Sequence, residues 1–123
     1  MKPKFEAGSN IAMKVPVHEY DRTITFYRDI LGFEEIKPSS PDNIETTVFN
    51  FGDKVLWIDK IPGISQAEIW LEVLTDDIEA ASKYLAKLGC VRRDEIEPLP
   101  DGFKGFWLAN PANIIHFITQ HNS

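Results

Sequence analysis

Cysteine is nearly absent from the chain, which has one, Cys90, among 123 residues. A single cysteine cannot form an internal disulfide, and it excludes a zinc site built from several thiolates. No hydrophobic run approaches the length of about 20 residues that a membrane-spanning helix needs. The opening residues MKPKFEAGSN lack the apolar centre of a secretory signal peptide. We therefore expect a cytoplasmic protein that does not associate with membranes.

Basic residues are also fewer than acidic ones. The chain has 13 Lys and Arg against 19 Asp and Glu, which gives a formal net charge of -6. This balance argues against nucleic-acid binding and mildly favours cationic ligands. The hydrophobic content of 43% is enough for an ordinary packed core. We therefore expect one soluble domain over residues 1–123.

The first half of the chain, residues 9–60, has the pattern of a strand, a helix and three further strands. Apolar residues alternate in "IAMKVPV", which is typical of a half-buried strand. A helix is predicted next, because apolar residues recur at helical spacing and Gly32 follows as a cap: Tyr20, Ile24, Tyr27 and Leu31. The segment "FEEIK" supplies the next strand. "IETTVFNF" and "KVLWIDK" then form a hairpin across Gly52 and Asp53.

The second half, residues 66–120, repeats this order after the loop "IPGIS". Alternation in "EIWLEVL" predicts a strand with Trp70 and Glu72 on one face. "TDDIEAASKYLAKLG" predicts a helix that Asp76 caps and Gly89 ends. "CVRRDEI", "FKGFWLA" and "NIIHFIT" follow as strands. The chain therefore looks like a duplicated βαβββ module.

Three segments resemble the vicinal oxygen chelate superfamily, which includes glyoxalase I, extradiol dioxygenases and bleomycin-resistance proteins. They are "VPVHEYDRTITFYRDILGFE", "TDDIEAASKYLAKLG" and "NPANIIHF". The last resembles the family motif Asp-Pro-x-Gly-x-x-x-Glu, although Asn110 and Ala112 depart from it and the turn is one residue shorter. The resemblance implies an α+β, glyoxalase/bleomycin-resistance-like fold. In that fold two paired βαβββ modules form a cup-shaped, partly open mixed sheet, with the ligand in the cup.

The metal enzymes of this family hold a divalent ion with His or Glu at four strand positions that face the cup. By resemblance these positions fall on Ala12, Trp57, Trp70 and His116. His116 alone could coordinate, whereas such sites need three or more N or O ligands from the protein. A shift of two residues would bring Asn10 or Lys14 to the first position and Glu68 or Glu72 to the third. Glu72 with His116 would then be the best metal pair, which is still too few. We therefore expect no bound metal and no cofactor.

Each candidate residue also has a structural alternative. Trp57 and Trp70 are expected either to form a platform for a ligand or to belong to the core. Glu72 is expected either to face the pocket or to be solvated. Lys14 is expected either to line the pocket or to place its ammonium group in water. For His116, the alternatives are a structural hydrogen bond, a ligand contact and, least favoured, metal binding.

The sequence therefore favours a small-molecule-binding protein of the glyoxalase/bleomycin-resistance type. It would bind an aromatic or cationic organic ligand, without a metal, through Lys14, Trp57, Trp70, Glu72 and His116. Three alternatives stay open: a metal-dependent lyase, isomerase or dioxygenase, a metal-free enzyme with His116 and Glu72 as an acid–base pair, or a regulatory module without chemistry. We also expect a homodimer, because each module presents an open sheet. The modules could pair within one chain or across the dimer.

Overall fold

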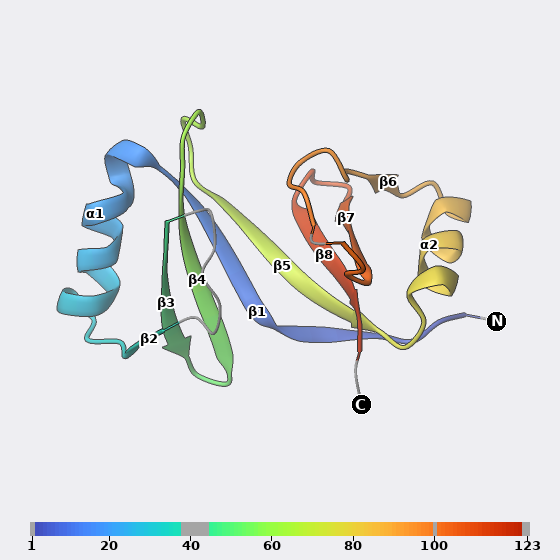
Figure 1. Cartoon of the computed structure of the whole chain (residues 1–123), viewed down its shortest axis with the longest axis horizontal. Helices are drawn as coiled ribbons and strands as arrows, with labels where there is room; N and C mark the ends of the chain where they lie inside the picture. The colour runs from blue at the N-terminus through green and yellow to red at the C-terminus, as the bar shows by residue number, and fades with distance from the viewer. Residues whose placement is uncertain (1, 38–44, 100, 122–123) are drawn as a thin grey trace. The chain divides into compact units, whose positions relative to one another are not determined.

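The structure is a computed structural model that describes residues 2–37, 45–99 and 101–121 (Figure 1). The described residues divide into two units by their contacts. The Ser9–Trp70 unit is one; the C-terminal unit combines Met1–Gly8 with Leu71–Ser123. The elements are β1 (Phe5–Pro16), α1 (Val17–Thr25), the π-helical η1 (Phe26–Ile30), β2 (Glu35–Ile36), β3 (Thr46–Phe51), β4 (Lys54–Ile61), β5 (Glu68–Thr75), α2 (Ile78–Lys87), β6 (Val91–Arg92), β7 (Gly105–Ala109) and β8 (Ile115–Gln120).

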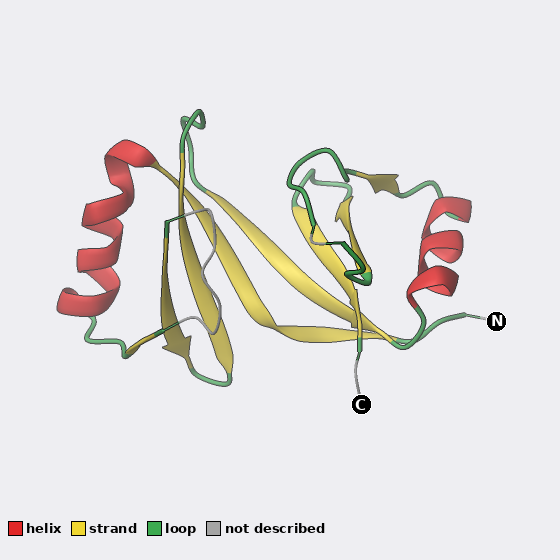
Figure 2. Ribbon diagram, in the orientation of Figure 1, coloured by secondary structure: helices red, strands yellow, loops and turns green. Residues whose placement is uncertain are grey.

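In the Ser9–Trp70 unit, four strands lie in the order β2-β3-β4-β1. β1 runs parallel to β4, while β3 is antiparallel to both of its neighbours. Helix α1 packs on one face of these strands through Tyr20 and Ile24 (Figure 2). Its partners are apolar side chains from β1, β3 and β4: Val15, Phe49, Leu56 and Ile58.

The predicted hairpin is confirmed. Phe51 pairs with Lys54, and Gly52 between them has φ 66°, a left-handed conformation that glycine adopts without steric cost. The segment "FEEIK" forms only the two-residue strand β2, which pairs with β3.

The first helix differs from the prediction of a single α-helix through Leu31. It is α-helical only to Thr25 and continues as the wider turn η1. There the Leu31 amide donates to the Phe26 carbonyl oxygen at 2.9 Å, five residues back. The extra residue in this turn breaks the 3.6-residue spacing on which the prediction relied. Leu31 is consequently 46% exposed and does not join the core.

In the C-terminal unit, the strands lie in the order β5-β8-β7-β6. β5 is parallel to β8, and β7 is antiparallel to β8 and β6. Helix α2 packs on these strands through Ile78 and Leu85 (Figure 1). The predicted cap is wrong by one residue, because the Asp77 carboxylate accepts from the Ala80 amide at 3.1 Å. The Asp76 carboxylate instead accepts from the amide of Lys4.

Both halves of the chain thus have the βαβββ order, and the α+β class with a mixed, open sheet is confirmed. The Ser9–Trp70 unit contains the expected module 9–60 and extends to Trp70. The C-terminal unit takes up the remainder of the expected module 66–120, from Leu71, together with the first residues of the chain. In the described part of the chain, α1 and α2 are both too short and too polar to cross a membrane.

Candidate functional site

Five candidate positions lie on one face of the β1–β4 pair in the Ser9–Trp70 unit, which we call the far face because it points away from α1. Side chains alternate between the two faces of a strand. Since Ile11, Met13, Leu56 and Ile58 pack toward α1, the residues between them point the other way. Across the register, Ala12 pairs with Trp57 and Lys14 pairs with Asp59. The far face therefore carries Asn10, Ala12, Lys14, Trp57 and Asp59.

Lys14 and Asp59 form a buried ion pair on the far face. The Lys14 ammonium lies 2.7 Å from the Asp59 carboxylate, and the two residues are 4% and 9% exposed. The same ammonium lies 4.2 Å from the centre of the Trp70 ring, a cation–π distance. The alternative that placed this ammonium in water is therefore wrong. The desolvated charge is held by a carboxylate and an aromatic face.

The two tryptophans have different environments. Trp57 is half-buried, and its indole N–H donates to the Asn10 side-chain oxygen at 2.8 Å, which fixes the ring orientation. Trp70 is 7% exposed, with the Lys14 ammonium against its ring. Trp57 therefore offers aromatic surface to a ligand, whereas Trp70 mainly supports Lys14.

Asp59 is a site residue that the sequence analysis missed, and Asn10 is one whose contact it did not predict. The alternation that places Trp57 on the far face also places Asp59 there, two residues later in β4. A signal was therefore present in the sequence. Their partners were not predictable in the same way, because Trp57 and Lys14 lie 47 and 45 residues away from them.

In the C-terminal unit, Glu72 and His116 point to opposite faces of the sheet. In the register between β5 and β8, Glu72 is opposite Phe117, and Leu71 is opposite His116. Neighbouring residues in a strand alternate in direction, so a difference of one position reverses the face. The expectation that Glu72 and His116 share a pocket, as a metal pair or an acid–base pair, is therefore wrong.

His116 lies on the face that packs against α2, not on a face with Glu72. It is half-buried, and its Nδ1 lies 3.1 Å from the Ile114 carbonyl oxygen. It lines a small cavity of about 190 Å³ together with Asn110 and apolar side chains: Phe5, Val73, Leu85, Leu108 and Ile118. The structure thus assigns His116 a backbone hydrogen bond and a place beside an apolar cavity.

Side-chain hydrogen bonds hold the turn that precedes β8. The Asn110 side-chain oxygen accepts from the amides of Ala112 and Ile114, both at 2.9 Å. Asn113 adopts φ 64°, a left-handed conformation that asparagine tolerates better than most residues. The pairing of β8 with β5 decides which residues of β8 face α2.

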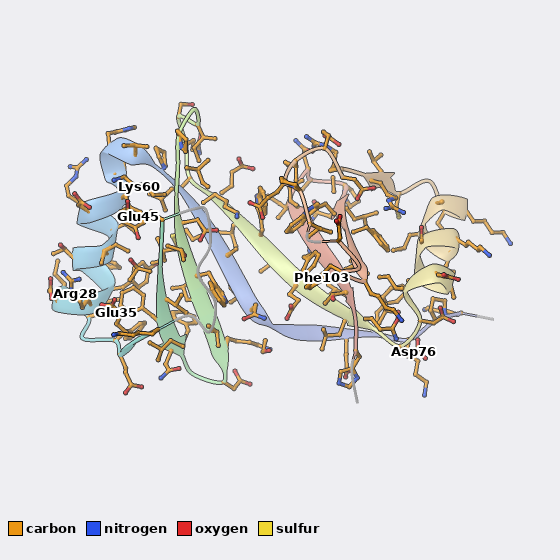
Figure 3. The ribbon with its side chains drawn as sticks, viewed as in Figure 1. Arg28, Glu35, Glu45, Lys60, Asp76 and Phe103 are labelled. Atoms are coloured by element: carbon orange, nitrogen blue, oxygen red, sulfur yellow. The ribbon has the colours of Figure 1, made fainter. Side chains whose placement is uncertain are left out.

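Glu72 shares its face with an aromatic cluster that the sequence analysis did not identify. The Trp107 and Phe117 rings lie 4.6 Å apart, and Phe103 lies 5.5 Å from Phe117. The Trp107 indole donates to the Glu97 carbonyl oxygen at 2.9 Å. Phe103, which is labelled in Figure 3, is 49% exposed. Alternation in "FKGFWLA" predicts that Trp107 and Phe106 point to different faces of the sheet. It does not predict which rings Trp107 contacts.

Tyr20 and Arg28, which lie outside these faces, have raised pKa values. Burial raises the pKa of the Tyr20 hydroxyl, and its 2.6 Å hydrogen bond with the Thr47 hydroxyl only partly offsets this effect. A hydrogen bond to Asp29, assisted by the more distant Glu35, raises the pKa of Arg28 (Figure 3).

The far face does not fit a divalent metal. Of the four positions that correspond to family ligands, Ala12 has no donor atom, and Trp57 and Trp70 offer no lone pair suited to a cation. His116, the fourth, lies against α2 in the other unit. Among residues 2–37, 45–99 and 101–121, no three His, Cys, Asp or Glu side chains gather closely enough to hold a metal.

Comparison with known proteins assigns the class of protein. The sequence profile of the Glyoxalase/Bleomycin resistance protein/Dioxygenase superfamily matches residues 10–114. The chain therefore belongs to this superfamily, and the resemblance found in the sequence is confirmed. A search of curated proteins finds no match to the chain.

Solved structures with the same fold include enzymes and an uncharacterised protein. A hypothetical protein from Bacillus halodurans C-125 has a TM-score of 0.65 at 11% identity, with 97% of this chain and 96% of that one covered. The Mn(II)-bound glyoxalase from Novosphingobium aromaticivorans gives 0.65 at 16%, with coverage of 96% and 40%. Homoprotocatechuate 2,3-dioxygenase from Arthrobacter globiformis gives 0.61 at 17%, with coverage of 99% and 38%. The chain thus spans less than half the length of either enzyme, and these likenesses concern the fold alone.

Proposed function

We propose that the chain is a small-molecule-binding protein that holds a planar aromatic ligand against Trp57 on the far face. The observation that carries this proposal is a half-buried tryptophan whose orientation is fixed, next to a buried ion pair. Trp57 donates to Asn10, and Lys14 with Asp59 lies two residues further along the same two strands, on the same face. An aromatic surface with a few oriented polar groups is typical of sites for small organic molecules.

The charge distribution on the far face favours an uncharged ligand over a cationic one. Asp59 is already neutralised by Lys14 at 2.7 Å, and the Lys14 ammonium occupies a face of the Trp70 ring. A cationic ligand would be repelled by the Lys14 ammonium, and the Asp59 carboxylate could not offset this repulsion because it is already paired with Lys14. A neutral ring on Trp57 would gain stacking without this repulsion. The net negative charge of the chain attracts cations only over a longer range, where salt screens the attraction. The charges on the far face therefore have the larger effect on a bound ligand.

The alternative that the superfamily suggests is a metal-dependent lyase, isomerase or dioxygenase. The donor set of the far face does not support it, since Ala12, Trp57 and Trp70 stand where ligands would be needed. A metal-free enzyme that uses Glu72 and His116 together is disfavoured too. Two groups on opposite faces of a sheet cannot act on the same atom of a substrate.

A matched set of naphthalene compounds tests the proposal. The neutral 2-naphthalenemethanol, the cationic 2-naphthylmethylammonium and the anionic 2-naphthoate share a ring and differ in charge. We expect the neutral compound to bind most tightly in calorimetry and to quench tryptophan emission. Trp57→Leu should weaken its binding by about 1–3 kcal/mol, the value of one aromatic stacking contact.

Phe103→Leu is the matched control, because it removes an exposed aromatic ring from the C-terminal unit. It should leave binding unchanged. Equal losses in Trp57→Leu and Phe103→Leu would contradict the proposed location. Preferential binding of the cationic compound would contradict the charge argument, and no binding by any of the three would remove the support for an aromatic ligand.

We also propose that the chain forms a homodimer. Large apolar side chains of α1, of η1 and of the residue that caps η1 remain exposed in the single chain: Val17, Phe26, Ile30 and Leu31. Exposed apolar surface of this kind often marks a contact between protein chains. Light scattering at micromolar concentration should give twice the mass of the chain, and a monomeric mass would refute the proposal.

A further inference from the structure

The cavity beside His116 has the size and lining of a site for one small ring. Its volume is about 190 Å³. An apolar protein cavity of about 150 Å³ is enough to bind benzene. None of the side chains that line the cavity carries a fixed charge, and five of the seven are apolar. The cavity therefore suits an uncharged molecule of one ring or two small fused rings.

The cavity lies where α2 meets the sheet. Leu85 of the helix lines it together with Val73 of β5, Leu108 of β7 and Ile118 of β8. Leu85 also packs against the core cluster that contains Leu108 and Ile118. A ring in this position would gain van der Waals contact with both the helix and the sheet.

His116 adds one polar group of defined character. Its Nδ1 lies 3.1 Å from the Ile114 carbonyl oxygen. A carbonyl oxygen only accepts hydrogen bonds, so Nδ1 must carry the proton and donate it. In a neutral imidazole, Nε2 is then an acceptor. His116, which lines the cavity, therefore has one ring nitrogen, Nε2, that can accept a hydrogen bond from a ligand.

We propose that this cavity is a second binding site, specific for a small neutral ring that carries one O–H or N–H donor. Phenol and indole are members of this class. The ring fills the space between Val73, Leu85 and Leu108, and its donor hydrogen-bonds to His116 Nε2. The site is independent of the far face, because all of its residues belong to the C-terminal unit.

Pairs of compounds that differ only in the donor test this proposal. Phenol is compared with anisole, and indole with 1-methylindole, by calorimetry at pH 8. One hydrogen bond to a neutral acceptor corresponds to a preference of up to about tenfold for the donor compound. We expect His116→Leu to reduce this preference to less than twofold. His18→Leu, which changes an exposed histidine in the other unit, should preserve it.

The location is tested separately. Val73→Phe should fill the cavity and weaken binding of phenol and anisole alike, whereas Phe51→Leu, which changes an exposed ring in the other unit, should leave both unchanged. If Val73→Phe does not fold, methyl NMR of the wild-type protein provides the same information. Phenol should then shift the signals of Val73 and Leu85 more than those of Leu56 in the other unit. Absence of phenol binding at millimolar concentration, an undiminished preference in His116→Leu, or shifts confined to the other unit would each overturn the proposal.

Discussion

Removal of one partner from the buried Lys14–Asp59 ion pair should destabilise the fold strongly. At 2.7 Å and an effective dielectric constant of about 20, the attraction between two unit charges is about 6 kcal/mol. Part of this attraction offsets the desolvation of side chains that are only 5% and 12% exposed. If one charge is removed, the other keeps its desolvation cost without compensation. We therefore expect Asp59→Asn and Lys14→Met each to cost about 3–5 kcal/mol.

The two substitutions should not be equivalent. Lys14→Met also removes the cation–π contact with Trp70 at 4.2 Å, which contributes up to about 2 kcal/mol when the cation is desolvated. Asp59→Asn keeps that contact and leaves an amide oxygen that can still accept from Lys14. Lys14→Met should therefore be the more destabilising change. Urea unfolding followed by circular dichroism measures both free energies.

A double-mutant cycle isolates the pair. Lys14→Met with Asp59→Asn removes both charges, so it should cost much less than the sum of the single changes. Glu45→Gln is the control, because its ion pair with Lys60 is 3.5 Å long with side chains 64% and 30% exposed (Figure 3). It should cost less than about 1 kcal/mol. Additive costs in the cycle, or an Asp59→Asn cost as small as that of Glu45→Gln, would refute the reasoning.

Three further predictions concern pH, packing and metal content. The pKa of Tyr20 is raised in the folded protein, so the unfolded chain loses this proton first as pH rises. The free energy of unfolding should therefore fall above about pH 10. Urea titrations should show a shallower fall for Tyr20→Phe. A Cβ at Gly8 would lie 2.8 Å from the Glu72 Cβ, so Gly8→Ala should lower the free energy of unfolding by about 1–3 kcal/mol. Glu72→Gly in the same chain should largely restore it. A loss below about 0.5 kcal/mol for Gly8→Ala would contradict the close contact. Protein purified without chelator or histidine tag should contain far less than one transition-metal ion per chain by elemental analysis, and a stoichiometric ion would contradict our view of the far face.

Much of the local structure was predictable because neighbouring residues decide it. The hairpin between β3 and β4 follows from two runs of β-branched and aromatic residues around Gly52, and the end of the second helix follows from Gly89. The first helix departs from prediction after Thr25, because a π-helical turn changes the spacing on which the pattern depends. The helix cap was misplaced by one residue, since Asp76 and Asp77 are equivalent as sequence signals and only contacts with Lys4 and Ala80 distinguish them.

The sequence by itself determined the family, the βαβββ order and the identity of the side chains at the family's metal positions. Whether those side chains are buried, and what they contact, was decided by the tertiary structure. Lys14 was expected either to line the pocket or to reach water, whereas strand pairing brings Asp59 to it from 45 residues away and makes burial of its ammonium group tolerable. His116 was expected to form a structural hydrogen bond, to contact a ligand or, least favoured, to bind a metal, and the register of β8 with β5 places it on the face that packs against α2. Side-chain direction in a strand reverses with every residue, so a local pattern cannot identify a face until the register with its neighbours is known.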